Sequence, residues 1–439
     1  MSKRSEAFDV VVIGAGAAGL AAAAELSRHG KSVCILEARD RIGGRIFTVC
    51  PRGGGIGLEL GAEFIHGESP AVFEQLRLTN DVAVDAAQSR YRASRSGHLQ
   101  QSEDLFELMK EELARVPKPR ADLSFADFLE HHQQRLSPAV RSFATMLVEG
   151  FDAADPTRAS AIEILKEWTG GSAADAPTFR PRLGYGRLID AMAASLDPEA
   201  VALRLHSVVS EVRWQKGKVA VHATRFGEQV DVHAAQAVIT LPLGVMQLPP
   251  QTPGSVQFTP ALPRKQLPLS RLHMGPVIKL VLCFNKPFWT ELDDGEHRDV
   301  AFFHATGAAF PTFWNTLPVR SSILVAWSGG PNAMRLAART TDEILRPAID
   351  SLAQVFGKSL NYRRLLDAVY WHDWQSDPFS NGAYSYAGVN GGAARRQLAK
   401  PVEQTLFFAG EATDEEESAG VGGALESGRR AARELLQDA

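Results

Sequence analysis

A lysine stands in the middle of an apolar run near the centre of the chain. Residues 275–284 read Gly-Pro-Val-Ile-Lys-Leu-Val-Leu-Cys-Phe, which predicts a strand with Lys279 inside it. A buried ammonium group loses its hydration, so Lys279 either points to water at a sheet edge or is kept inside for a chemical reason. Alternation places it on one face with Val277, Val281 and Cys283, and that pattern is compatible with both interpretations.

A glycine turn near the start of the chain joins a predicted strand to a predicted helix. Residues 8–13 are apolar, Gly-Ala-Gly-Ala-Ala-Gly follows at 14–19, and residues 20–29 favour a helix that Gly30 ends. In the dinucleotide fingerprint, Gly14 allows the tight turn, Gly16 lets the backbone approach a pyrophosphate, and Gly19 lets helix and strand pack closely. The next strand, residues 32–36, ends at Glu37, which is placed to accept hydrogen bonds from an adenosine ribose. These features predict a dinucleotide site and leave both FAD and NAD(P) open.

More glycines follow at both ends of the chain. Gly43 and Gly44 suggest a second close approach of backbone to cofactor, and Arg45 could contact phosphate or flavin. Near the C-terminus, an apolar strand ends in Gly410 and Glu411, and a glycine-rich helix start at residue 420 begins a helix that runs to about residue 436. An extended, two-ended cofactor explains this repetition better than a simple NAD domain.

Taken together, these residues resemble the flavin-containing amine oxidase family, which includes monoamine oxidases, polyamine oxidases and flavin histone demethylases. The matching blocks occur in order along nearly the whole chain. They are residues 14–19 with Glu37, residues 41–45, 59–67 and 184–188, Lys279 with Phe288 and Trp289, Trp374 with residues 382–384, and Gly410 and Glu411 with residues 420–424.

The resemblance implies an α/β fold with a Rossmann-like FAD-binding domain of discontinuous segments, and a substrate-binding domain made of a mixed sheet and a helical cap. We expect residues 1–75, 185–260 and 365–439 in the first, and 76–184 and 261–364 in the second. Helical spacing in residues 104–115 and 125–135, and alternation in 201–232, agree with this division. The residues that the resemblance places against FAD are Gly14, Gly16, Ala17, Ala18, Gly19, Glu37, Ala38, Arg39, Gly43, Gly44, Arg45, Gly61, Ala62, Glu63, Phe64, Val209, Trp374, Gly410, Glu411, Gly420, Val421 and Ala424.

The resemblance also assigns Lys279, Tyr384 and His66 to the reacting end of the site. Lys279 falls on the family's active-site lysine, which lies near flavin N5 and reaches it through a water molecule. An apolar pocket would disfavour its ammonium form and let it assist proton movement. Tyr384 resembles one wall of an aromatic cage that guides the neutral amine, and His66 resembles a histidine near the substrate of animal polyamine oxidases.

Two positions depart from the monoamine oxidases. Ala383 stands where relatives with covalent flavin have cysteine, so we expect noncovalent FAD. Val421 stands at the second cage position, where monoamine oxidases have tyrosine. A one-sided cage leaves more room beside the flavin, so we expect a bulkier or longer amine.

The expected reaction is the oxidation of a primary or secondary amine, polyamine or other, to an imine that hydrolyses to a carbonyl product, with oxygen reduced to hydrogen peroxide. An L-amino-acid oxidase is an alternative, but no arginine can be assigned to a substrate carboxylate from spacing. A desaturase or porphyrinogen oxidase on the same fold is another, and a non-catalytic FAD-binding protein is a third.

The composition and charge of the chain limit the kinds of binding partner that we expect. A net charge of −4 without long basic runs gives no reason to expect nucleic acid or an anionic membrane surface. The basic residues before position 5 resemble the start of a signal peptide, but glycines interrupt the apolar stretch that follows, so we expect a soluble, cytoplasmic protein.

Some residues are expected to have ordinary structural roles. The three cysteines, Cys34, Cys50 and Cys283, lack metal-site spacing and are expected as reduced core residues. The acidic run 414–417 is expected as a solvated loop, although its charge would attract polyamines. Single tryptophans at 168, 314 and 327 could line a pocket, but as isolated aromatic residues they are expected in the core.

Overall fold

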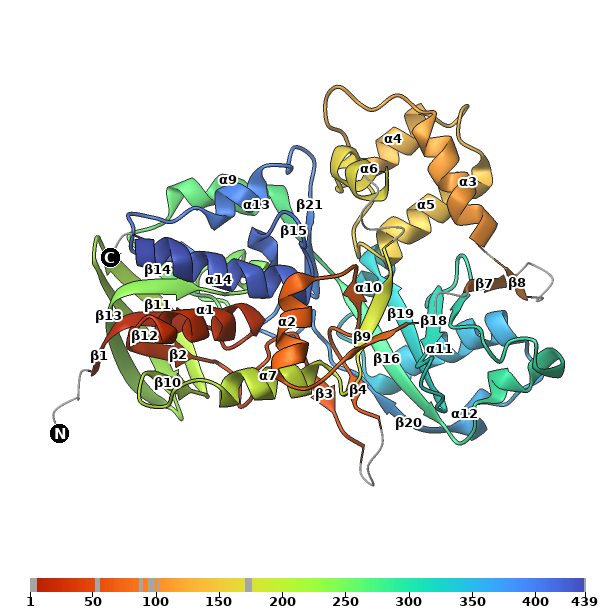
Figure 1. The fold of residues 1–439 in the computed structure, drawn as a ribbon. Coiled ribbons are helices and arrows are strands. Elements are labelled where there is room, and N and C mark those ends of the chain that lie inside the picture. The colour runs from red at the N-terminus through yellow and green to blue at the C-terminus, as the bar shows by residue number, and fades with distance from the viewer. Residues whose placement is uncertain are drawn as a thin grey trace.

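The fold is described from a computed structural model, which covers residues 6–51, 56–86, 90–93, 99–101, 103–169 and 176–437. Within these ranges, every helix is too short or too polar to span a lipid bilayer. Two large sheets and a group of helices make up the molecule, and the α/β fold class is confirmed (Figure 1).

The first sheet has the expected glycine turn at its centre. Its strands run in the order β10-β2-β1-β13-β12-β11-β14, and β22 pairs with β13. The bounds are β1 Glu6–Ile13, β2 Val33–Leu36, β10 Val201–Arg204, β11 Ser207–Gln215, β12 Lys218–Arg225, β13 Glu228–Ile239, β14 Gln257–Thr259 and β22 Leu406–Phe408. The pairs around β1 are parallel, whereas β11, β12 and β13 form the expected antiparallel meander. Segments far apart in the sequence therefore build one sheet around the glycine turn.

Two helices from opposite ends of the chain pack together on this sheet. α1 spans Ala17–Arg28 and α14 spans Val421–Gln437, close to the helix bounds expected from the sequence. Gly428 allows their close approach, because an added Cβ there would lie 2.2 Å from the backbone oxygen of Ala18. Figure 1 shows both helices along one face of the sheet, with α7 (Tyr185–Ala194) and α2 (Pro70–Leu78) beside them.

The second sheet contains the lysine-bearing strand, β16 (Val277–Phe284). Its order is β20-β16-β19-β18-β17-β7-β8, so β16 lies inside the sheet and Lys279 is only 2% exposed. The other strands are β20 Leu366–Tyr370, β19 Ile323–Gly329, β18 Thr312–Asn315, β17 Phe302–His304, β7 Arg90–Ala93 and β8 Leu99–Gln101. The edge interpretation of Lys279 is thus excluded.

The faces of β16 divide as alternation predicted. Ile278, Leu280 and Leu282 pack in a core with helix α11 (Thr341–Phe356), whereas Val281 and Cys283 pack on the opposite face with Trp314 and Trp327. The segment from residue 365 begins with β20, which pairs with β16 before the chain returns to the first sheet.

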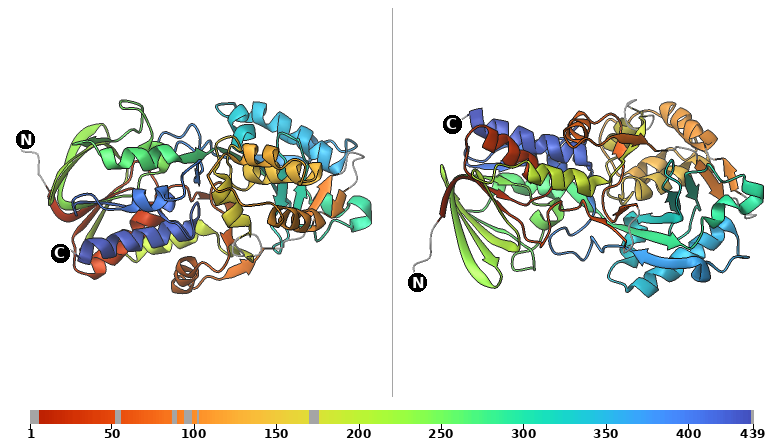
Figure 2. Two further views of the ribbon diagram at one scale, coloured as in Figure 1. Left: turned by 90° about the horizontal axis from the view of Figure 1, so that it is seen from above. Right: turned by 60° about the horizontal axis from the view of Figure 1, so that its bottom comes forward.

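Helices α3 to α6 gather at the top of the molecule in Figure 1, over the second sheet, as a helical cap. They span Glu103–Ala114, Phe125–His131, Pro138–Gly150 and Ala161–Thr169, and they share an apolar core. The remaining helices and strands are β3 Thr48–Val49, β4 Leu58–Glu59, β5 Ile65–His66, β6 Ala83–Asp85, β9 Thr178–Pro181, α8 Leu243–Met246, α9 Pro263–Arg271, β15 Leu272–Gly275, α10 Gly330–Leu336, α12 Tyr362–Leu365, β21 Tyr384–Ala387 and α13 Ala394–Ala399. Figure 2 shows that β1 and α14 lie at the end of the molecule opposite the cap.

The three cysteines are not all core residues. Cys34 is buried in β2 and Cys283 is partly buried in β16, as expected. Cys50 is exposed, so the core prediction is wrong for it. Cys50 directly follows the short strand β3, outside any apolar strand that could bury it.

Candidate active site

One cavity of about 880 Å³ joins the glycine turn of the first sheet to Lys279 of the second. It is lined by both sheets, by helices α5 and α6 of the cap, and by the start of α14. All the residues predicted for cofactor or catalysis line it except Gly19. Residues far apart in the sequence are thus brought to a single site.

The glycine turn has the backbone that a dinucleotide needs. Gly14 has a φ of +108°, which favours glycine, and an added Cβ on Gly19 would lie 2.0 Å from the Gly14 backbone oxygen. Gly19 therefore packs helix against strand, as predicted, while Gly14 and Gly16 line the cavity. The second glycine pair lies against this turn, since Gly43 bridges to Gly16. This backbone cradle at the start of α1 fits FAD phosphates.

Glu37 directly follows β2 and has a buried carboxylate at the cavity wall. Its two oxygens accept hydrogen bonds from the backbone amides of Ala15 and Arg39, each at 2.9 Å. Carboxylate oxygens accept more than one hydrogen bond, so these contacts fix Glu37 while leaving capacity for a ribose. Val209 of β11, also predicted to lie against FAD, lines the same cavity. The Glu37 carboxylate is an acceptor that fits the ribose hydroxyls of FAD.

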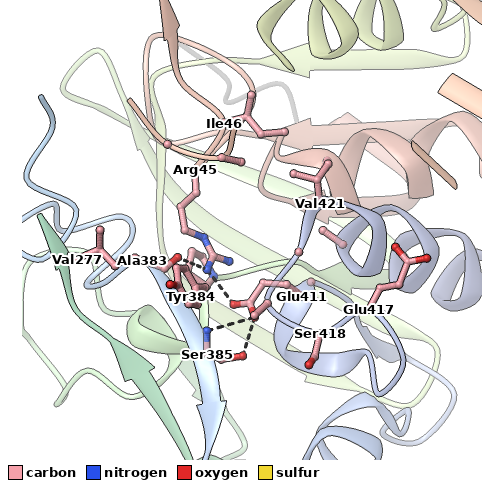
Figure 3. Close-up of a pocket in the computed structure, with 18 of the residues that line it drawn as sticks. Arg45, Ile46, Val277, Ala383, Tyr384, Ser385, Glu411, Glu417, Ser418 and Val421 are labelled. Atoms are coloured by element: carbon pink, nitrogen blue, oxygen red, sulfur yellow. Dashed lines mark hydrogen bonds and ion pairs between the residues drawn. The ribbon is translucent and has the colours of Figure 1, made fainter. Parts of the chain in front are cut away.

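Arg45 joins the two ends of the chain. Its guanidinium donates to the backbone oxygen of Ala383 and to the Glu411 carboxylate, both at 2.8 Å (Figure 3). Ser385 donates its hydroxyl to the same carboxylate at 2.6 Å, and it also accepts a hydrogen bond from Arg395. Burial raises the pKa of Glu411, but the charges of Arg45 and Arg395 outweigh it and lower the pKa. The main contact of Arg45 is therefore its ion pair with Glu411, which stabilises the wall of the cavity.

Lys279 does not lie in an apolar pocket. Its ammonium group is 2.8 Å from the Glu63 carboxylate and donates to the backbone oxygen of Gly61 at 3.1 Å. The expectation of apolar surroundings is wrong because β4 and the loop after it bring Glu63, predicted only as a cofactor residue, against β16. An ammonium group has three donors, and two are used by these described partners. The third is available to a molecule in the cavity.

Glu63 is itself held by a second cation. Arg180 of β9 donates to it at 2.9 Å, and the Trp314 indole donates to it at 3.0 Å. Arg180 also donates to backbone oxygens of Leu317 and Asn315, so it ties Glu63 to the second sheet. Burial raises the pKa of Glu63, but the charges of Lys279 and Arg180 lower it below its ordinary value.

Aromatic side chains line the cavity on the side of the second sheet. Tyr384 donates its hydroxyl to the backbone oxygen of Phe151 at 2.7 Å. His66 packs with Phe64 and Phe151, at ring distances of 6.0 and 5.3 Å. Trp168, Trp314 and Trp327 also line this cavity, which is the alternative to the core positions expected for them. The sequence left both positions open because a buried aromatic residue beside a cavity has the same local pattern as one in a solid core.

Carboxylates that the sequence did not single out line the cap side of the cavity. Asp152 follows α5 and Glu167 lies on α6, and both lie beside Tyr384. The acidic loop behaves in part as expected, because Glu415 and Glu416 are exposed, but they also line the cavity. No sequence signal marks Asp152 or Glu167, since isolated acids on cap helices usually face water.

Comparison with known proteins finds relatives along nearly the whole chain. A model described as flavin containing amine oxidoreductase matches residues 17–436. Among curated relatives, Lysine-specific histone demethylase 1 homolog 3 of Arabidopsis thaliana is 29% identical over 97% of this chain, which spans only 30% of that protein's length. Polyamine oxidase 4 of Oryza sativa subsp. japonica is 28% identical over 97% of this chain and 88% of its own. The solved structure of wild-type putrescine oxidase bound to putrescine covers 99% of this chain and 100% of its own, with a TM-score of 0.81 and 22% identity, and shows the same fold.

Proposed function

The chain belongs to the flavin-containing amine oxidoreductases, and on that premise we propose that it oxidises a bulky or long primary or secondary amine to an imine, with oxygen reduced to hydrogen peroxide. The imine then hydrolyses to a carbonyl product. Family membership implies FAD as the cofactor, and bound FAD supplies the two-electron acceptor for this chemistry. We propose the domain division expected from the sequence, with the return from the second sheet after β20.

The observation that carries the proposal is the continuity of the cavity. The same space contacts the dinucleotide glycines, Lys279 and Tyr384. An amine entering from the cap side would therefore lie between aromatic walls that exclude water. The size of the cavity, about 880 Å³, supports an amine larger than benzylamine in addition to the cofactor.

The roles of the chain's own residues follow from their contacts. Gly14, Gly16 and Glu37 would hold the adenosine diphosphate part of FAD. Lys279 would hold and move protons at its free N–H, and Tyr384 would orient the amine. Ala383 lines the cavity with a methyl group that cannot form a bond to the cofactor, which supports noncovalent binding.

The amino-acid oxidase alternative is less well supported by the charges. The arginines that line the cavity in the described ranges are Arg39, Arg45 and Arg395, and each is already close to a carboxylate. A substrate carboxylate would have to compete with Asp377 or Glu411 for them. A non-catalytic FAD protein would have no use for a buried lysine aimed at this cavity.

Anaerobic reduction of the bound flavin tests the proposal. The FAD-loaded protein is mixed without oxygen with polyamines, monoamines and amino acids, and visible flavin absorbance is recorded. We expect bleaching by long or bulky amines, and hydrogen peroxide on admission of air. Bleaching by amino acids alone would favour the alternative oxidase, and a strong preference for benzylamine would contradict the bulky substrate.

A further inference from the structure

A buried carboxylate on the cap side of the cavity has an oxygen without a partner. Asp152 is 8% exposed and lines the cavity, and its Oδ2 atom has no hydrogen-bond partner among the described residues. Burying such an oxygen without compensation is costly, and native proteins seldom leave one unpaired. A ligand that donates to Asp152 would remove this cost.

Asp152 does not stand alone. Burial, and next to it the negative charge of Glu167, raises the pKa of Asp152 well above its ordinary value. Burial also raises the pKa of Glu167, against the opposing charge of Arg395. Arg395 is itself engaged with Ser385 and with Glu411, so it does not neutralise the pair. Two acids from different parts of the cap therefore line one cavity, and two cations that also line it, Lys166 and Arg395, are paired with Glu163 and Glu411.

This pair lines the same cavity as Tyr384, the aromatic wall predicted to guide the amine. Burial raises the pKa of the Tyr384 hydroxyl, and the negative charges of Asp152 and Glu167 raise it further. The Tyr384 hydroxyl donates to the backbone oxygen of Phe151, the residue before Asp152, and so does not satisfy the Asp152 carboxylate. The unpaired oxygen therefore belongs to the residue next in the chain to the one that Tyr384 contacts.

The carboxyl groups of Asp152 and Glu167 determine which kind of ligand would bind here. Because burial disfavours the charged form of these acids, a carboxylate here needs a positive charge beside it, and an alkylammonium group supplies both that charge and three hydrogen-bond donors. Glu163, Glu415 and Glu416 line the same cavity, and their charges would attract cations toward it. We propose that Asp152 and Glu167 form a subsite for a second positively charged nitrogen, which makes the protein selective for amines with two or more nitrogens. This inference rests on the proposed oxidation of an amine at Lys279.

The experiment compares a linear diamine with the alkylamine of the same chain length, which has a methyl group in place of the distal ammonium. Dissociation constants are measured by anaerobic flavin bleaching and, independently, by calorimetry. The variants are Asp152→Asn and Glu167→Gln, with Asp190→Asn as a matched control. Asp190 is exposed on α7 and does not line the cavity. Flavin content and thermal melting check that each variant folds.

We expect the unaltered protein to bind the diamine more tightly, and Asp152→Asn to weaken diamine binding about 10- to 100-fold, because one charge-assisted hydrogen bond is lost. Alkylamine binding should be weakened far less than diamine binding, and the control should change neither. Equal binding of the two amines, or a preference that survives both cavity variants, would overturn the subsite while leaving amine oxidation intact. If neither amine bleaches the flavin, the proposed function fails. Calorimetric binding of the diamine that Asp152→Asn weakens would then still support the subsite, and its absence would refute it.

Discussion

Replacement of Glu63 by glutamine is the sharpest test of how the buried lysine is held. The substitution keeps the shape of the side chain and removes the negative charge between Lys279 and Arg180. The two ion pairs have N–O distances of 2.8 and 2.9 Å. With an effective dielectric constant of about 20, each attraction is worth about 6 kcal/mol before the cost of desolvation is subtracted.

The measured loss should be smaller than this attraction, because burying the three charges already costs free energy. Removal of one partner from a buried ion pair typically lowers stability by about 3–5 kcal/mol. We expect that range for Glu63→Gln, since two buried cations then lose their shared carboxylate. Lys279→Met should cost less, because Glu63 keeps Arg180 and the Trp314 indole.

The assay is urea unfolding of the FAD-free protein, followed by tryptophan fluorescence, for both single variants and the double variant. Removal of the lysine should relieve part of the effect of Glu63→Gln, so the double variant should be more stable than the sum of the single losses predicts. A Glu63→Gln protein that unfolds at the same urea concentration as the unaltered protein would refute the reasoning. So would strict additivity, because it would mean that Glu63 and Lys279 do not interact.

Three further predictions concern residues outside this ion pair. Gly19→Ala should lower the free energy of unfolding by about 1–3 kcal/mol and should also lower the flavin content, because the added Cβ would meet the Gly14 backbone oxygen. Gly16→Ala should lower the flavin content alone, because the protein has room for its Cβ. Equal losses of stability in the two variants would contradict this. Lys265→Met should lower the free energy of unfolding by about 1–3 kcal/mol, because the buried Lys265 ammonium donates to three backbone oxygens near the end of α13, and unchanged urea unfolding would disprove it. Burial raises the pKa of Glu59 from 4.5 to about 7, so the folded state binds a proton in that interval that the unfolded state lacks. The resulting stabilisation, about 3 kcal/mol below pH 4.5, should be lost as pH rises to 7. Glu59→Gln should flatten this slope, and a slope that persists in the variant would rule out Glu59 as its source.

Much of the fold could be predicted from local patterns. The strand, glycine turn and helix at residues 6–28, and the C-terminal helix, lie close to where periodicity and glycine spacing put them. Alternation in β16 also divided its two faces correctly. These features follow from residues near one another in the chain, so short-range geometry is enough to specify them.

The surroundings of the site could not be predicted in the same way. Lys279 could be singled out in sequence, but its partner Glu63 lies more than two hundred positions away, and the Arg180 that fixes Glu63 comes from yet another segment. The sequence does not distinguish a second buried lysine, Lys265, whose role is structural because its ammonium group donates to a backbone oxygen of α13. The two lysines differ in what the tertiary fold places around their ammonium groups.

The sequence by itself therefore determined the family, the dinucleotide turn and the position of the lysine-bearing strand. Only the tertiary structure decided that Lys279 is paired with a carboxylate, that the tryptophans border a cavity, and that Asp152 and Glu167 face the same space. The physical reason is that electrostatic surroundings and cavity walls depend on contacts between distant segments. Such contacts leave no periodic signal in the residues that make them.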